Sequence, residues 1–246
     1  MAGRSTGDCV EIVLARHAQP DWEPTGRAVD DPGLTQLGHE QAKLTAESLS
    51  DQRFDAFYTS PLRRAIETAQ PISDALGIRP KVRSWLRELG LPSMQGFTGE
   101  QVQAFFREAN ARNLDQWWDA MPGGESFRHF YERVSSGIEG MLKGDHRLGT
   151  HEVFGHRIWR LPESRERILI VAHEGTNAVL ISHLLGIEPV PFAWMRFSHA
   201  WAGISVVHTL EVAGGAVFGV ESFNRTNHLA SLRTHPGWLR DGRTQS

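Results

Sequence analysis

Residues 11–22 read EIVLARHAQPDW, a short apolar run followed directly by charged and polar residues. The run itself, residues 12–15, is typical of a buried parallel strand. It ends on Arg16 and His17, which a protein core accommodates only when their polar atoms have partners. Ligands bind at the carboxyl ends of strands in open α/β sheets, so this pair is expected at the edge of a site. A guanidinium there can bind an oxyanion, and an imidazole can act as a base or a nucleophile.

The composition is that of an ordinary globular domain. The chain has 246 residues, of which 40% are hydrophobic and 22% charged, and its net charge of -3 does not favour a nucleic acid or an anionic membrane as partner. No apolar run approaches the roughly 20 residues that a membrane-spanning helix needs. The first ten residues lack the apolar core of a signal peptide, so we expect a cytoplasmic protein. Cys9 is the single cysteine, which excludes an internal disulfide and a cysteine-rich metal site.

Strand and helix patterns alternate along the chain. Strands are expected at residues 12–15, 54–58, 81–86, 168–172, 204–210 and 216–223, and helices at residues 39–49, 62–76, 124–142 and 175–185. This alternation predicts βαβ units and a mostly parallel sheet. The sequence Ala213-Gly214-Gly215 between the last two strands predicts a hairpin turn, and therefore an antiparallel edge.

Two stretches interrupt the alternation. Residues 97–118 look helical but irregular, with four aromatic side chains expected as buried anchors, namely Phe105, Phe106, Trp117 and Trp118. Residues 143–167 lack periodicity and are interpreted as an insertion with a hairpin near residues 156–161. The whole chain, residues 1–246, is expected to form one domain, with insertions near 97–120 and 143–167 and a loose tail near 227–246.

A second strand also ends on a histidine. The apolar run of residues 168–172 precedes His173, so two strands bring an imidazole to one sheet edge, although either histidine alone could be a structural one. Arg63 and Arg64 open the helix after the second strand. The helix macrodipole opposes a cation there unless an anion lies between them. Glu88 follows the third strand and is either a solvated loop carboxylate or a partly buried acid with a raised pKa.

These side chains together suit phosphoryl transfer. Arginine binds a phosphoryl group with two parallel hydrogen bonds, an imidazole can accept the phosphoryl group covalently, and a carboxylic acid can protonate the leaving oxygen. No cluster of carboxylates and no spacing of histidines or cysteines suggests a metal, so neither a metal nor a cofactor is expected. The arginine and histidine charges would then provide the electrostatic stabilisation themselves.

The chain resembles the histidine phosphatase superfamily, the cofactor-dependent phosphoglycerate mutase-like proteins. The matching motifs follow in family order over about residues 12–185 and read LARHAQPDW, LTQLGHEQA, YTSPLRRAIETA, LRELGLPSMQG, PGGES and VAHEGTNAVL. A late segment, NRTNHL at residues 224–229, is also similar. The resemblance implies a three-layer α/β/α sandwich with a mostly parallel sheet and an antiparallel edge.

The resemblance also implies a role for each chemical residue. His17 would be the nucleophile that becomes phosphohistidine. Arg16 and Arg64 would hold the phosphoryl oxygens, and His173 would be the second histidine of the phosphate pocket. Glu88 would act as the general acid for the departing alcohol and then as the base for water.

Three residues depart from the family pattern. Ala18 stands where the family has glycine, and its methyl group is tolerable if the backbone stays in an ordinary region. Glu23 stands where many members have asparagine near the phosphate, and Glu174 where they have glycine, so both are candidate pocket residues. A carboxylate beside a phosphate dianion is repulsive. We therefore expect Glu174 to point away from the pocket, the alternative being a pair with an arginine or with a cationic or hydroxyl-rich part of the substrate.

Three functions fit these observations. The leading hypothesis is a metal-independent phosphatase that hydrolyses a phosphomonoester of a small molecule through phosphohistidine on His17. A phosphoglycerate mutase-type phosphotransferase ranks second, because mutases tend to carry a longer segment than residues 89–124 between the two flanking motifs. The third is a catalytically weak regulatory protein that binds phosphorylated ligands, which the departures at Ala18, Glu23 and Glu174 motivate. The sequence predicts neither the alcohol part of the substrate nor the oligomeric state.

Overall fold

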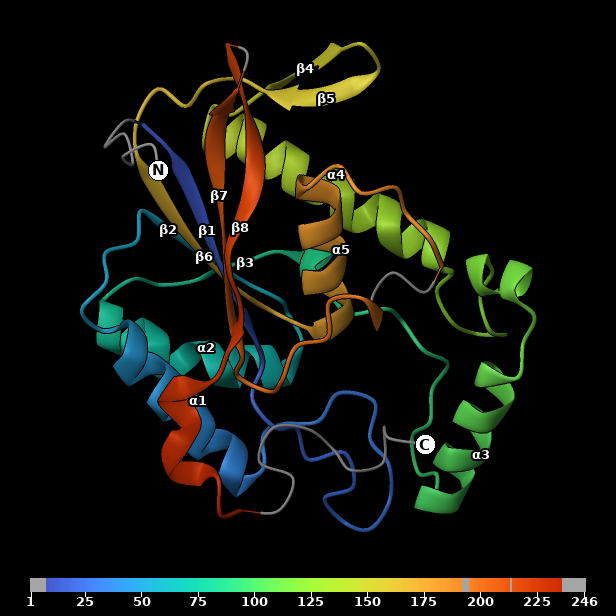
Figure 1. The fold of residues 1–246 in the computed structure, drawn as a ribbon. Coiled ribbons are helices and arrows are strands. Elements are labelled where there is room, and N and C mark those ends of the chain that lie inside the picture. The colour runs from blue at the N-terminus through green and yellow to red at the C-terminus, as the bar shows by residue number, and fades with distance from the viewer. Residues whose placement is uncertain (1–7, 192–194, 213, 236–246) are drawn as a thin grey trace.

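A mixed sheet lies at the centre of the molecule (Figure 1). The computed structural model describes residues 8–191, 195–212 and 214–235. Within them the sheet has eight strands in the order β3-β2-β6-β1-β7-β8-β5-β4. Their bounds are β1 Val10–Arg16, β2 Ala56–Thr59, β3 Lys81–Val82, β4 Thr150–Val153, β5 His156–Trp159, β6 Glu166–Ala172, β7 Ile204–Val212 and β8 Gly215–Arg225.

The parallel half of the sheet contains the two apolar strands that end on a histidine. Strand β1 pairs with β6, β6 with β2, and β2 with β3, all in parallel. The register sets Arg16 opposite Ala172. The residues that follow, His17 and His173, therefore leave the sheet at the same edge, as the sequence predicts.

The antiparallel half is larger than the predicted edge. Strand β7 pairs antiparallel with β1, β8 with β7, β5 with β8, and β4 with β5. The hairpin expected near residues 156–161 forms earlier, because the chain turns at Phe154 and Gly155, whose φ angles are 51° and 77°. The segment of residues 143–167 thus extends the sheet at its far end.

Helices cover both faces of the sheet, so the predicted three-layer α/β/α sandwich is confirmed (Figure 1). The helices are α1 Gln36–Leu49, α2 Arg63–Leu76, α3 Gly99–Asn110, α4 Phe127–Asp145 and α5 Glu174–Leu184. Alternate side chains of β1 serve the two faces: Ile12 and Leu14 pack with α4 and α5, whereas Val13 and Ala15 pack with α1 and α2. Burial on both faces explains why residues 12–15 of this strand are all apolar.

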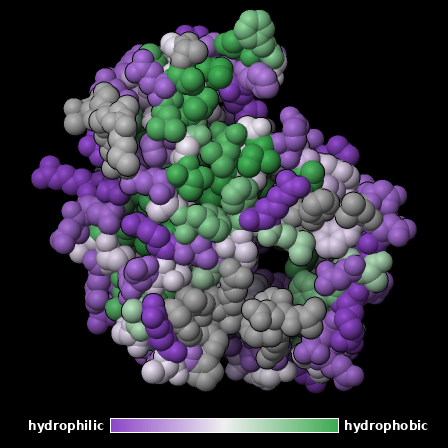
Figure 2. All heavy atoms as spheres, in the orientation of Figure 1, coloured by the Kyte–Doolittle hydropathy of each residue, from purple (hydrophilic) through white to green (hydrophobic). Residues whose placement is uncertain are grey.

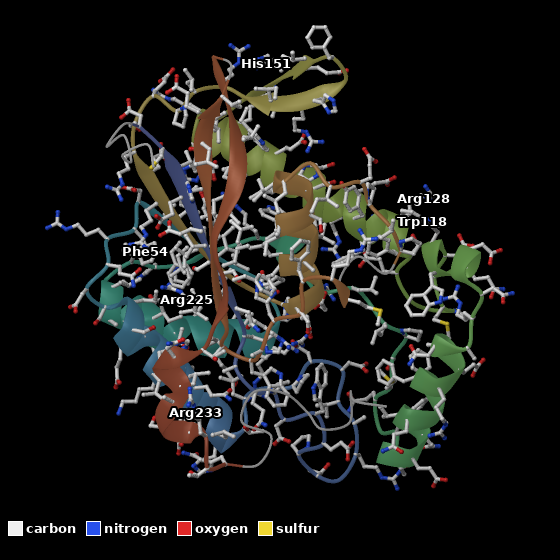
Figure 3. The ribbon with its side chains drawn as sticks, viewed as in Figure 1. Phe54, Trp118, Arg128, His151, Arg225 and Arg233 are labelled. Carbon is white, nitrogen blue, oxygen red and sulfur yellow. The ribbon has the colours of Figure 1, made fainter. Side chains whose placement is uncertain are left out.

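The anchors expected in the first insertion are not buried. Helix α3 has no buried residue, and Phe106 is 41% exposed. Helix α3 stands beside the sandwich and not against the sheet (Figure 1), so no apolar layer covers it. Trp118 is half-buried, packs on Phe127 and lies under the guanidinium of Arg128 (Figure 3).

The start of the expected loose tail is ordered. Residues Asn227–Leu232 form a 3₁₀ helix, and Leu229 and Leu232 are buried in a small cluster with Ala42 of α1. His228 Nε2 lies 3.1 Å from the carbonyl oxygen of Ala202. The prediction of a loose tail is therefore wrong for this part, and residues 236–246 lie outside the described residues.

The expected third strand is also shorter than predicted. Only Lys81–Val82 pairs in the sheet, and the chain then turns into a 3₁₀ helix, Ser84–Leu86. Leu86 is fully buried in the core beneath α4 and α5, which fixes the start of the following loop. That loop carries Glu88.

Polar side chains cover much of the visible surface, and an apolar area lies in its upper half (Figure 2). Leu210, Val220 and Phe223, from the hairpin of β7 and β8, are exposed apolar residues. Among the described residues, no helix is both long enough and apolar enough to cross a membrane.

Candidate active site

Two buried histidines meet at the carboxyl ends of β1 and β6. The backbone N–H of His17 donates to the carbonyl oxygen of Ala172 at 2.8 Å, which continues the strand pairing to the edge of the sheet. The centroids of the His17 and His173 rings lie 5.1 Å apart. His17 is 3% exposed and His173 is 0% exposed. The structure therefore brings together the two histidines that the sequence singles out.

The hydrogen bonds of His17 determine which of its ring nitrogens carries the proton. Nδ1 lies 2.7 Å from the carbonyl oxygen of Ala18, which can only accept, so Nδ1 must donate. Nε2 accepts a hydrogen bond from Nε of Arg64 at 3.3 Å. Burial, and then the charges of Arg64 and Arg16, hold the pKa of His17 well below its usual range. His17 is thus a neutral imidazole with a lone pair on Nε2, the form that a nucleophile requires.

Arg64 lies in the first turn of α2 and reaches into the same pocket. It is 4% exposed, and the Trp22 ring lies 5.0 Å from its guanidinium carbon. Burial lowers the pKa of Arg64 to about 10, so it remains charged at neutral pH. Its Nη1 is buried and makes no hydrogen bond to any described residue, with the Asp31 carboxylate 3.7 Å away. A buried cationic donor of this kind favours an anionic ligand.

The other arginine of the pair faces solvent. Arg63 donates to Glu67 one turn along α2 at 2.6 Å, and two thirds of its side chain is exposed. Two cations at the start of a helix are electrostatically unfavourable, and the two arginines are accommodated differently. One arginine is paired on the surface, and the other is directed at the histidines.

Thr68 joins the loop after β1 to helix α2. Its Oγ1 accepts the backbone N–H of Ala18 at 3.0 Å and donates to the carbonyl oxygen of Arg64 at 2.7 Å. Ala18 is fully buried and is not among the residues with positive φ, so its methyl group causes no backbone strain. The departure from glycine at this position is therefore tolerated, as expected.

His173 is held by a serine from the neighbouring strand end. Its Nε2 lies 2.7 Å from Oγ of Ser60, which follows β2. Burial, followed by the charges of Arg64, His17 and Arg16, lowers the pKa of His173 well below its usual value. Its Nδ1 is buried and has no hydrogen-bond partner in the part of the chain that the structure describes.

Glu88 approaches the pocket from the loop after the 3₁₀ helix. Its carboxylate accepts the backbone N–H groups of Leu89 at 3.0 Å and Gly175 at 2.9 Å. Burial raises the pKa of Glu88, although both hydrogen bonds and the charges of Arg64 and Arg16 act in the opposite direction. A raised pKa is what a proton donor needs.

Arg133 braces the loop that carries Glu88. It donates to the carbonyl oxygens of Trp85 at 2.8 Å and Arg87 at 3.1 Å, and pairs with the carboxylate of Glu125 at 2.7 Å. Glu125 in turn accepts the backbone N–H of Gly90 at 3.1 Å. The sequence gives no signal for Arg133, because it lies in the middle of a helical pattern and its role depends on carbonyl groups 48 and 46 residues away.

Glu174 does not point away from the pocket, so the expectation for this residue is wrong. Its Oε2 lies 2.9 Å from Nη1 of Arg16, and Ser198 donates to its Oε1 at 2.5 Å. The reason is the strand register, because Arg16 lies opposite Ala172 and therefore beside the first turn of α5. The alternative, a pair with an arginine, is what the structure contains.

Glu23, the other candidate pocket residue, lies at the start of α3. A Cβ atom placed on Gly99 would lie 3.4 Å from Oε1 of Glu23. The helix macrodipole favours a carboxylate at this end of a helix.

Within the described residues, no group of three or more histidines, cysteines, aspartates or glutamates is arranged to hold a metal ion.

Comparison with known proteins identifies the family of the chain. Residues 12–217 match the model of the histidine phosphatase superfamily, branch 1. The chain belongs to this superfamily. The matched range contains the six motifs found between residues 12 and 185 and excludes only the late segment at residues 224–229. The match therefore confirms the resemblance seen in the sequence.

Relatives within the superfamily include phosphatases and mutases. Phosphoserine phosphatase 1 of Hydrogenobacter thermophilus is 29% identical over 205 residues, which cover 82% of this chain and 88% of that protein. A 2,3-bisphosphoglycerate-dependent phosphoglycerate mutase of Brucella anthropi is 29% identical over 210 residues, covering 81% and 91%. The native structure of a mycobacterial glucosyl-3-phosphoglycerate phosphatase superposes with a TM-score of 0.68 at 25% identity, covering 89% of this chain and 100% of that one. The predicted phosphoglycerate mutase-like fold is therefore confirmed.

Proposed function

We propose that the protein is a phosphatase that hydrolyses a phosphomonoester of a small molecule through a phosphohistidine intermediate on His17. The observation that carries the proposal is the state of His17: its Nδ1 donates to the carbonyl of Ala18, so the lone pair lies on Nε2, inside a buried pocket with two arginines. Membership of the histidine phosphatase superfamily and the similarity to phosphoserine phosphatase 1 support the same class of reaction.

In the first step, the phosphoryl group moves from the ester to the enzyme. Arg16 and Arg64 bind the phosphoryl oxygens, and Nε2 of His17 forms a bond to phosphorus. The bond between phosphorus and the ester oxygen breaks, and the departing oxygen takes the proton of Glu88. The positive charge that develops on the His17 ring is stabilised by the hydrogen bond from Nδ1 to Ala18.

In the second step, water releases phosphate. The carboxylate of Glu88 removes a proton from a water molecule as its oxygen attacks phosphorus, and the bond to Nε2 breaks. The lone pair returns to Nε2, and Glu88 is again protonated for the next cycle. Arg64 stabilises the transferring group by hydrogen bonds and by its charge, and the neutral His173 contributes hydrogen bonding; the positions of both beside His17 support these roles.

Hydrolysis of a generic aryl phosphate in the presence of EDTA tests this proposal. The wild type is expected to hydrolyse the ester, whereas His17→Ala is expected to lose at least ~1,000-fold in kcat, on the order of the loss when a covalent nucleophile is removed. Equal rates for the two proteins would reject the phosphohistidine mechanism.

A phosphoglycerate mutase activity is the second candidate, because the Brucella mutase aligns over 81% of this chain. A mutase would return the phosphoryl group from His17 to a hydroxyl of the bound product and not to water. A coupled assay for the conversion of 3-phosphoglycerate to 2-phosphoglycerate discriminates between the two. Fast conversion with slow release of phosphate would favour the mutase.

The proposed substrate is a small phosphorylated molecule, and the proposed location is the cytoplasm. The net charge of -3 supports neither a nucleic acid nor an anionic membrane surface as partner. Cell fractionation with detection of the protein by antibody tests the location, and recovery in the membrane or secreted fraction would contradict it.

A further inference from the structure

The carboxylate of Glu174 occupies one side of the proposed phosphate site. Nη1 of Arg16 donates to the carbonyl oxygen of His199 and lies 2.9 Å from Oε2 of Glu174. The other carboxylate oxygen accepts the hydroxyl of Ser198 at 2.5 Å. Two partners thus fix the Glu174 side chain, of which 30% is exposed. A substrate phosphoryl group must share the Arg16 guanidinium with this carboxylate.

Glu174 also lies on the side from which the alcohol departs. The proton donor for the alcohol is Glu88, whose carboxylate accepts the backbone N–H of Gly175 at 2.9 Å. The contact is close, because a Cβ atom on Gly175 would lie 2.6 Å from Oε1 of Glu88. Glu174 is the preceding residue in the same helical turn. The alcohol of a bound ester is therefore flanked by the first turn of α5, and Glu174 begins that turn.

A fixed carboxylate at this place repels a second negative charge on the substrate. In a partly buried site with an effective dielectric constant well below that of water, like charges several ångströms apart interact unfavourably, and such repulsion is a common source of specificity. A neutral or cationic alcohol meets no such penalty.

We infer that Glu174 is a specificity-determining residue that selects phosphomonoesters of neutral or cationic alcohols and discriminates against alcohols with a second acidic group near the ester. The inference rests on the proposed phosphatase function and narrows its substrate class. It also assigns a role to the residue that stands in place of the family glycine.

Two substrates that differ in one group test the inference. Glycerol 3-phosphate and 3-phosphoglycerate have the same chain, but the first ends in a hydroxymethyl group and the second in a carboxylate. The ratio of their kcat/KM values, neutral over acidic, measures the discrimination. Glu174→Gln is expected to lower this ratio about tenfold, equivalent to about 1.4 kcal/mol, mainly through a lower KM for 3-phosphoglycerate. Glu174→Gly is expected to change the ratio in the same direction.

Matched controls separate this result from failure of the proposed function. Glu211→Gln removes the same charge from an exposed residue of β7 near the amino end of β1, at the opposite edge of the sheet, and is expected to leave the ratio unchanged. If the ratio in both Glu174 variants equals that of the wild type while His17→Ala is inactive on both esters, the inference is wrong and the phosphatase stands. If His17→Ala hydrolyses both esters at the wild-type rate, the proposed function fails first.

Discussion

Gly175 leaves the space that the carboxyl group of Glu88 occupies, so Gly175→Ala is a direct perturbation of the proposed proton donor. The added Cβ would lie 2.6 Å from Oε1 and 3.2 Å from Cδ of Glu88, whereas ordinary contacts begin at 3.4 Å. The carboxyl group must therefore move by about 0.8 Å, the difference between 2.6 and 3.4 Å, and the hydrogen bond from the Gly175 N–H is strained. The helix itself tolerates alanine, which has a higher helix propensity than glycine.

The expected effect is on catalysis and depends on the leaving group. A misplacement of about 1 Å at a catalytic group costs on the order of 100-fold in rate, and general acid catalysis as a whole contributes about 100- to 10,000-fold. We therefore expect Gly175→Ala to lower kcat about 100-fold on an alkyl phosphate, whose alkoxide must be protonated. On 4-nitrophenyl phosphate, whose phenolate departs without a proton, the decrease is expected to be less than about tenfold.

Steady-state kinetics on both esters, with circular dichroism to check the fold, measure this effect. Gly140→Ala is the matched control, because Gly140 is a glycine of helix α4 and, apart from its chain neighbours and the adjacent backbone of its own helix, no atom of the described residues lies within 4 Å of the position that its new Cβ would take. This control is expected to retain wild-type rates. A folded Gly175→Ala protein that hydrolyses the alkyl ester as fast as the wild type would refute the role of Glu88 as the proton donor.

Two further predictions concern stability. Thr68→Val removes the acceptor for the buried N–H of Ala18 and is expected to lower the free energy of unfolding by about 1–3 kcal/mol, measured by urea denaturation. It is also expected to lower kcat, because the loop that carries His17 loosens. An unchanged urea midpoint would contradict the role of this hydrogen bond. The pKa values of His17 and His173 are lowered and that of His228 is lowered to about 4, so the unfolded chain binds more protons below pH 6.5 than the folded protein does. The free energy of unfolding is therefore expected to fall between pH 6.5 and pH 4 by about 1.4 kcal/mol per pH unit for each such histidine, and to be independent of these groups above pH 6.5. Unfolding curves at pH 7.5 and pH 5.0 measure the slope, which His228→Gln should reduce; equal slopes in the two proteins would count against the buried neutral state of His228.

The parts of the site that the sequence predicts correctly are those fixed by strand pairing. An apolar run that stops on a polar pair marks the carboxyl end of a strand, and two such runs that pair in parallel must bring His17 and His173 together. The electrostatic argument pointed to Arg63 and Arg64 together, because the helix macrodipole disfavours a cation there unless an anion binds nearby, and only the resemblance to the family selected Arg64.

The parts that the sequence does not predict depend on what lies opposite a side chain. The direction of Glu174 is determined by Arg16 and by Ser198, which is 24 residues away in an irregular segment. The sequence of α3 predicts a helix, but a helical pattern does not show whether another layer covers that helix. The hairpin turn was hidden because Phe154, a bulky residue, adopts a φ of 51°, where glycine or asparagine is the usual signal.

A covalent bond between phosphorus and Nε2 of His17 is the central feature of the proposed mechanism. Rapid mixing with a phosphomonoester, quenching in alkali, in which phosphohistidine survives, and peptide mapping by mass spectrometry test it most directly. The expected result is a phosphoryl group on His17 within the first turnover, absent from His17→Ala. Complete hydrolysis by the wild type with no phosphoryl group on His17 at any time, or with the group on His173 instead, would contradict the mechanism.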